Sequence, residues 1–150
     1  MVKSWRAAWL PAAILVTCLA LPACRTAPPP ATATPSNATL SPEALQTELS
    51  ALPPGNAGAG KALFSAVGCV ACHSLEAGVR VVGPSLSGVA TRAGMRKAGY
   101  SAQLYLYESI TQPNTYLVEG FPGGVMPQDF KTRLKPQDLS DLIAFLMTEQ

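Results

Sequence analysis

Two cysteines and a histidine stand close together near the middle of the chain, in the run Cys69-Val70-Ala71-Cys72-His73. This C-x-x-C-H spacing is typical of covalent haem attachment, in which two thiols add across the vinyl groups of one porphyrin. Two intervening residues let both thiols reach neighbouring edges of the ring, and the next residue can bring its imidazole beneath the iron. The motif therefore predicts haem c bound through Cys69 and Cys72, with His73 as an axial ligand of the iron.

Three other uses of these residues are weaker. A structural zinc site takes four ligands, whereas the motif contains the only cysteines and the only histidine between residues 55 and 150. A thioredoxin-like redox motif belongs to a strand–helix setting, and the residues before Cys69 have the periodicity of a helix. A plain disulfide leaves His73 without a purpose, so haem attachment is the favoured interpretation.

The second axial ligand cannot be another histidine, because His73 is the only one in the chain. Methionine is then the expected neutral ligand, although a lysine or an open position would also be compatible with the sequence. Met147 falls in a helical pattern, where methionine usually fills a core, and Met95 lies among charged residues. Met126 belongs to a proline- and glycine-rich run, residues 121–127, which cannot be helical and can approach a flat ligand. Met126 is therefore predicted as the ligand.

The elements that must position these groups are predicted to be helices, because no stretch shows the sustained alternation of a half-buried strand. Three helices are expected: residues 59–67, a helix from a Ser101 cap to just before Pro113, and a helix from Pro136 to near the C-terminus. A further short helix is compatible with a cap at Ser41 and three leucines along one side: Leu45, Leu49 and Leu52.

The first 23 residues are predicted to be a signal peptide, because Lys3 and Arg6 precede an uncharged run over residues 7–23. The run ends in Leu21-Pro22-Ala23-Cys24, which resembles a bacterial lipobox and makes Cys24 the expected lipidation site. An uncleaved membrane anchor and ordinary cleavage that releases a soluble protein are the alternatives. The lipobox interpretation predicts an exported protein, anchored in the membrane and facing the periplasm or the cell exterior.

The rest of the chain divides by composition. Residues 24–54 contain seven prolines, which favours an extended Pro/Ala/Thr-rich tether over a packed core, and residues 55–150 form the predicted domain.

The chain has eleven Lys and Arg against nine Asp and Glu, a formal charge of +2. Nucleic-acid binding needs a larger basic excess, so nucleic acid is not an expected partner.

The predicted domain resembles class I monohaem cytochromes c. Gly60 and Phe64, together with the Leu-Ile-Ala-Phe-Leu run at residues 142–146, are similar to the family's crossed first and last helices. The resemblance implies an all-α fold of three to five helices packed around one covalently attached haem. Residues 105–127 are especially similar to the cytochrome c domain of bacterial oxidase subunit II and to the monohaem cytochrome subunit of alternative complex III.

The same resemblance assigns roles to residues outside the haem motif. Residues 83–88, Gly-Pro-Ser-Leu-Ser-Gly, are similar to the family's loop in which a proline carbonyl accepts the ring N–H of the haem histidine. Pro84 is that proline here. The family's tryptophan at a haem propionate has no counterpart after residue 23, and three residues are candidates to replace it: Arg92, Arg96 and Tyr100.

The function implied is transfer of single electrons between respiratory or photosynthetic membrane partners: a quinol-oxidising complex, a terminal oxidase or a reaction centre. If His73 and Met126 fill both axial positions, no site is left for a small-molecule substrate, which favours an electron carrier over an enzyme. A small peroxidase-like enzyme would need an open iron with an acid–base group beside it. A redox or gas sensor would need a displaceable Met126. Both stay open as alternatives.

Overall fold

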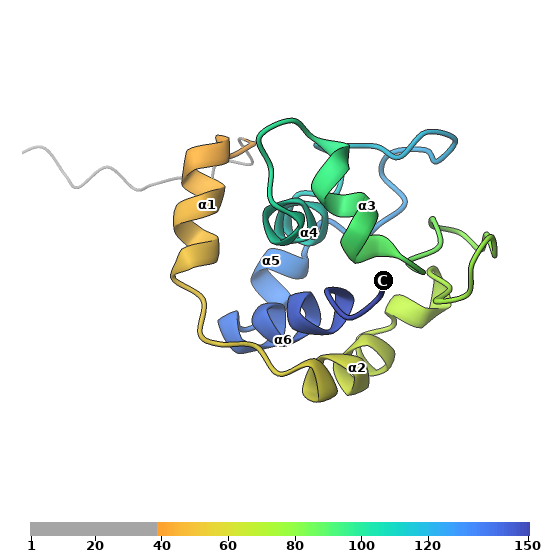
Figure 1. Cartoon of the computed structure of the whole chain (residues 1–150), viewed down its shortest axis with the longest axis horizontal. Helices are drawn as coiled ribbons and strands as arrows, with labels where there is room; N and C mark the ends of the chain where they lie inside the picture. Colours follow the sequence, from red (N-terminus) through yellow and green to blue (C-terminus); the bar gives the residue numbers. More distant parts are fainter. Residues whose placement is uncertain (1–38) are drawn as a thin grey trace, which may run out of the picture. The chain divides into compact units, whose positions relative to one another are not determined.

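The computed structural model describes residues 39–150 as a set of helices, and this part of the chain contains no strand. The elements are α1 (Pro42–Ser50), α2 (Ala57–Ala66), the 3-10 turn η1 (Cys69–Ala71), α3 (Val89–Arg96), α4 (Ala102–Thr111), α5 (Phe130–Arg133) and α6 (Pro136–Leu146) (Figure 1). The all-α prediction is confirmed. Helix α1, which lies within the predicted tether, and the four-residue α5 raise the number of helices above the expected three to five.

Polar side chains start three of the helices. Ser41, Asn56 and Ser101 each accept a hydrogen bond from the backbone N–H three residues later, at 3.3, 2.9 and 3.1 Å. The helix predicted over residues 59–67 begins earlier, at Ala57, because Asn56 caps it. The starts predicted at Ser101 and Pro136 are confirmed.

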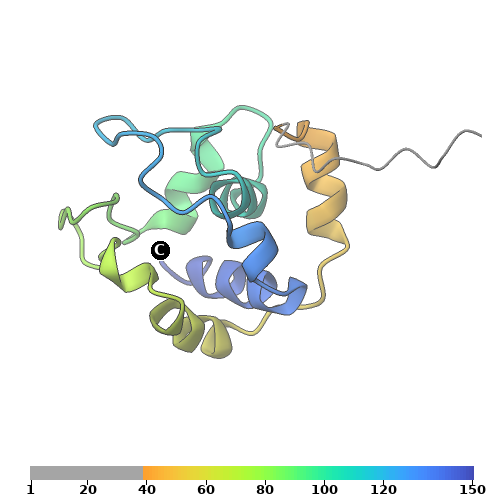
Figure 2. The same cartoon turned by 180° about the vertical axis from the view of Figure 1, so that it is seen from behind.

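Helices α2 and α6 cross in direct contact, although they lie far apart along the chain (Figures 1 and 2). At Gly60 the two backbones come so close that a Cβ atom would overlap the carbonyl oxygen of Asp141. The buried rings of Phe64 and Phe145 lie beside this point, with centroids 5.5 Å apart and planes inclined by 58°. Tilted ring pairs of this kind are favourable. Gly60 therefore permits the close approach of the two helices, and the contact between Phe64 and Phe145 stabilises it.

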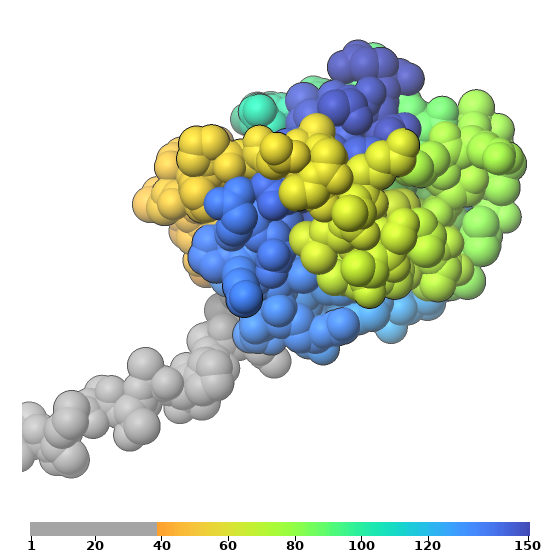
Figure 3. Space-filling model, turned by 90° about the horizontal axis from the view of Figure 1, so that it is seen from below, coloured from red at the N-terminus to blue at the C-terminus, as the bar shows by residue number. Residues whose placement is uncertain are grey.

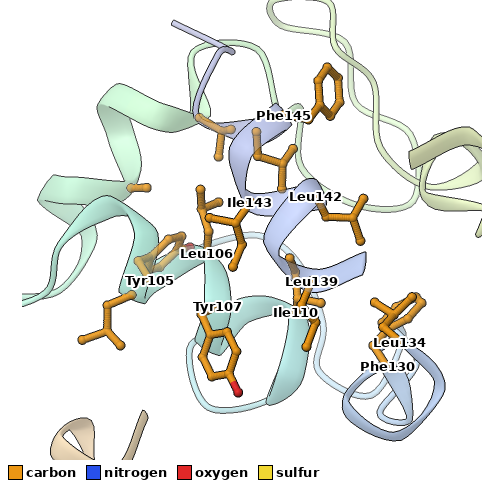
Figure 4. Close-up of a cluster of buried hydrophobic side chains, with 14 of the residues drawn as sticks. Tyr105, Leu106, Tyr107, Ile110, Phe130, Leu134, Leu139, Leu142, Ile143 and Phe145 are labelled. Atoms are coloured by element: carbon orange, nitrogen blue, oxygen red, sulfur yellow. The ribbon is translucent and has the colours of Figure 1, made fainter. Parts of the chain in front are cut away.

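The buried core lies mainly between α4 and α6 (Figure 4). Leu106 and Ile110 come from α4, and Leu139, Leu142 and Ile143 come from α6; all five side chains are buried. These positions follow the three- and four-residue spacing of a helix face. The core thus gives α6 two packing partners, α2 and α4.

A buried ion pair ties the end of α3 to α4. The Glu108 side chain is only 2% exposed, and its carboxylate accepts hydrogen bonds from Lys97 Nζ at 2.6 Å and from Tyr100 Oη at 3.1 Å. Partial burial by itself lowers the pKa of Lys97, but the hydrogen bonds and charges of Glu108 and Tyr100 together outweigh it, and the pKa is raised. The ammonium group therefore stays charged at neutral pH, and the link between α3 and α4 persists.

The N-terminal predictions fall largely outside the described residues. The signal peptide over residues 1–23, the lipidation site Cys24 and the first part of the tether belong to that portion of the chain. Among residues 39–150, no helix is long and apolar enough to cross a membrane.

The second part of the predicted tether is helix α1, and it packs on α4. Leu45 is completely buried in the core. The Glu48 carboxylate accepts hydrogen bonds from Tyr107 Oη at 2.9 Å and from Lys131 Nζ at 2.8 Å, so α1 also contacts α5, and Figure 3 shows α1 continuous with the surface of the C-terminal part. The packed unit thus begins near residue 40 and not at residue 55. The burial of Leu45 and the hydrogen bonds of Glu48 hold this segment in a packed helix, although the prolines on either side of it favour an extended backbone.

Candidate functional site

A cavity of about 260 Å³ lies between the segment after α2 and the segment before α5. Its volume is close to the lower end of the range of ~300–1,000 Å³ typical of small-molecule and cofactor sites. Buried apolar residues of α2, α4 and α6 form part of its wall: Phe64, Leu106, Ile110, Leu142 and Leu146. It is also lined by every predicted site residue within the described part of the chain: Cys69, Cys72, His73, Pro84 and Met126.

Helix α2 ends abruptly just before the cysteine segment. Gly68 adopts a left-handed conformation, with φ of 88°, and η1 follows at once. The backbone N–H of His73 then bonds to the carbonyl oxygen of Cys69 at 2.9 Å. This compact turn brings the half-buried thiols of Cys69 and Cys72 to the same cavity wall, where no disulfide joins them.

The alternative uses of the cysteines find no support at this site. Burial raises the pKa of the Cys69 thiol, whereas redox-active C-x-x-C cysteines have a lowered pKa that favours the thiolate. Over residues 39–150, no three or more His, Cys, Asp or Glu side chains are grouped so that they could hold a metal ion. The Cys69 thiol thus lacks the electrostatics of a thioredoxin-like site, and the described residues lack the ligand set of a zinc site.

The imidazole of His73 is held in one orientation. Its Nδ1 lies 2.8 Å from the carbonyl oxygen of Pro84, and because a carbonyl can only accept, Nδ1 carries the hydrogen. The neutral ring then has its lone pair on Nε2, the atom available to a metal. Gly83 packs directly against the ring, where a Cβ atom would overlap it, and its N–H bonds to the carbonyl oxygen of Cys72 at 2.8 Å.

Met126 reaches the cavity from the loop between α4 and α5. It is half-buried and, of the methionines in the described residues, only Met126 lines the cavity. Met95 is 74% exposed, and Met147 lines a separate groove between α1 and α6. The loop is shaped by the Asn114 side chain, whose Oδ1 accepts a hydrogen bond from the Gly124 N–H at 2.7 Å.

Of the three residues considered as partners of a haem propionate, the structure places two at the cavity and one away from it. Arg92 and Arg96 line the cavity, and Arg92 donates through Nη2 to the carbonyl oxygen of Ser85 at 2.9 Å. Tyr100 is not part of the cavity lining and donates to Glu108 instead. Arg92 and Arg96 thus lie at the cavity, although the Arg92 guanidinium already donates to the backbone carbonyl oxygens of Ser85 and Ser87.

The sequence pattern did not predict two aromatic residues of the cavity wall, Tyr105 and Tyr116. Tyr105 and Tyr116 meet edge to face, with ring centroids 5.5 Å apart, and burial raises the pKa of Tyr105. Their eleven-residue separation places them on different elements, so only the fold brings them together. Both rings add flat, largely apolar surface to the cavity.

The chemistry of the lining fits haem c. Two thiols on one turn, an oriented imidazole and a thioether surround one apolar space, and a glycine leaves room beside the imidazole. Nitrogen and thioether donors are the axial ligands found in c-type cytochromes.

Comparison with known proteins agrees with this fit. Residues 57–150 match the family model described as cytochrome c. A cytochrome c from Gossypium barbadense is 35% identical over 107 residues, which cover 63% of this chain and 90% of the relative. A cytochrome c2 iso-1 from Magnetospirillum fulvum is 38% identical over 93 residues, which cover 53% of this chain and 89% of the relative.

Proposed function

Because this chain belongs to the cytochrome c family and binds haem c covalently, we propose that it is a membrane-tethered electron carrier whose iron is held by His73 and Met126. Haem c supplies a one-electron iron centre. The residues of the chain attach the porphyrin, hold the two axial donors and keep water from the ring.

One observation carries this proposal: Cys69, Cys72, His73 and Met126 all line a single cavity. The Pro84 carbonyl orients His73 so that Nε2 is available to the iron. Met126 supplies a neutral thioether, a ligand type that raises the reduction potential relative to histidine alone. The buried leucines, isoleucine and phenylalanine of the wall exclude water, which disfavours the additional charge of ferric iron.

The composition of the cavity supports a carrier over a peroxidase-like enzyme. Its ionisable side chains other than the haem-motif residues are arginines and tyrosines: Arg92, Arg96, Arg133, Tyr105 and Tyr116. None of these residue types exchanges protons readily at neutral pH, whereas peroxidase-like chemistry needs an acid–base group beside an open iron. With His73 and Met126 on the iron, electrons would pass only to and from protein partners: a quinol-oxidising complex, a terminal oxidase or a reaction centre.

The packing of α1 bears on the proposed tether. The N–H of Leu40 bonds to Gln112 Oε1 at 3.0 Å, so the anchored domain begins at that point. If Cys24 carries the lipid, the 15 residues from 25 to 39 connect the lipid to the packed domain. A chain of this length spans at most about 50 Å. This length would keep the haem near the membrane surface and raise the effective concentration of membrane-bound partners.

The test of the ligand assignment is the sulfur-to-iron charge-transfer absorption of the oxidised full-length protein. We expect the band in the wild type, its loss in Met126→Ala and its retention in Met95→Ala, the matched control with an exposed methionine. Absence of the band from the wild type would refute His/Met ligation. Tight carbon monoxide binding by the reduced wild type would instead favour the sensor or enzyme alternatives.

The tether has an independent test. Metabolic labelling with a radioactive fatty acid should mark the wild type and leave Cys24→Ser unlabelled. An unlabelled wild type would contradict lipidation and leave the carrier assignment untouched.

A further inference from the structure

Two loops border the cavity on the same side of the domain. The first, residues 74–88, follows His73 and is called the proximal loop here; the second, residues 112–129, carries Met126 and is called the methionine loop. Figures 1 and 2 show both loops projecting at one edge of the molecule, beyond α3. Residues of both line the cavity.

The proximal loop is fastened at its base. The Gly83 N–H bonds to the carbonyl oxygen of Cys72 at 2.8 Å, and the Leu86 N–H bonds to the carbonyl oxygen of Ser74 at 2.8 Å. The Ser85 hydroxyl donates to the carbonyl oxygen of Glu76 at 2.7 Å. These bonds connect the loop directly to the haem motif, so its tip has a stable support.

Arg80, near the tip, reaches across to the methionine loop. Its Nη2 donates to the carbonyl oxygen of Gly120 at 3.0 Å, and its guanidinium carbon lies 4.3 Å from the centroid of the Phe121 ring. Gly120 has φ of 81°, a left-handed conformation that glycine adopts readily in a turn. Within the described residues, this is the only hydrogen bond between the two loops.

The methionine loop itself has little to hold it closed. Eleven of the residues from 113 to 128 are exposed, and segments with few buried apolar contacts open at low cost in free energy. Phe121 is one of its partly buried side chains and lines the cavity, five residues before Met126. A contact that holds Phe121 against the cavity also limits the movement of Met126.

We propose that Arg80 is a positioning residue for the axial methionine, because it clasps the methionine loop to the proximal loop and keeps Met126 at the iron. This inference rests on the proposed ligation by Met126. When the clasp is absent, the open state of the methionine loop is more populated, and a competing ligand gains access to the iron in proportion to that population.

The test is a titration of the oxidised full-length holoprotein with imidazole, which replaces methionine on ferric iron, followed by loss of the sulfur-to-iron band. Arg80→Ala should bind imidazole about fivefold to tenfold more tightly, the effect expected for one cation–π contact and one charged hydrogen bond at an exposed site. Arg80→Lys keeps the charge and a single donor and should recover part of the wild-type affinity. Lys61→Ala, an exposed charge on α2, is the control and should match the wild type.

The outcomes are separable. Tighter imidazole binding by Arg80→Ala, at a thermal unfolding midpoint close to that of the wild type, supports the clasp, since a general loss of stability would lower the midpoint as well. Imidazole affinity within twofold of the wild type for Arg80→Ala overturns it. A wild type without the sulfur-to-iron band overturns the ligation by Met126 first, and the clasp with it.

Discussion

The two sides of the cavity are built by different means. On the side of His73, α2 and α6 touch backbone to backbone at Gly60, and Phe64 and Phe145 are only 3% and 4% exposed. On the side of Met126, a mostly exposed loop depends on individual contacts, such as the bond from Gly124 to Asn114 at 2.7 Å. Close packing tolerates no added atom, whereas single hydrogen bonds can break one at a time. We therefore expect the histidine side to be rigid and the methionine side to open locally.

The largest expected effect comes from removing the group that both sides share. Cys69→Ala/Cys72→Ala, purified without haem, should lose most of its cooperative thermal transition, because the apolar wall would face water. Circular dichroism against temperature measures this, with the haem-loaded wild type as the control. Hydrogen exchange should then show more protection in α2 and α6 than in residues 113–127. A sharp transition at the wild-type midpoint would contradict a structural role for the haem.

The second prediction concerns the packed side. Gly60→Ala should lower the free energy of unfolding by about 3 kcal/mol, because the new methyl group would overlap the Asp141 carbonyl and force the helices apart. Gly94→Ala is the matched control in α3, where a Cβ atom would have ordinary contacts of 3.9 Å or more. It should raise stability by about 0.5–1 kcal/mol through helix propensity. Denaturant unfolding compares the two, and equal values for both variants would argue against the close crossing.

The third prediction concerns the loop. Asn114→Ala removes the acceptor of the Gly124 N–H, a bond worth about 1 kcal/mol. Amides of residues 113–127 should therefore exchange about fivefold faster, while the midpoint of global unfolding stays near that of the wild type. Thr115→Ala, a change at the exposed neighbouring residue, serves as the control. If Asn114→Ala instead lowered the global midpoint as much as Gly60→Ala does, the distinction between the two sides would be lost.

The smallest effect concerns α1, away from the cavity. Burial and the hydrogen bond to Glu48 raise the pKa of Tyr107 above its ordinary value of 10.0, so the folded state favours the protonated phenol. This stabilisation is complete below about pH 10 and is lost as pH rises through the raised pKa. Tyr107→Phe should cost about 1 kcal/mol at neutral pH and make the decline in stability above pH 10 shallower. Denaturant unfolding from pH 7 to 11 tests both points, and an unchanged slope above pH 10 would contradict them.

Local signals made part of the fold predictable. Ser101 and Pro136 start helices where capping and proline preferences place them, and the C-x-x-C-H run identifies the cofactor. Helix α3 was missed because the residue before it, Gly88, has φ of 64° and offers no side-chain cap. Its stability comes from packing on α4, a contact that no local pattern encodes. The four-residue α5 is likewise too short to produce a periodic pattern.

The sequence by itself determined the covalent chemistry: the haem motif, the single histidine and a methionine in a loop that cannot be helical. Spacing within a few residues is enough for these features, because they depend on the local backbone. The tertiary structure alone decided that α1 belongs to the packed domain, through a Glu48 carboxylate shared with Tyr107 and Lys131, 59 and 83 residues away. It also placed Arg80 over Phe121. Such contacts join side chains that are far apart along the chain, and only the packing of the helices determines which of them meet.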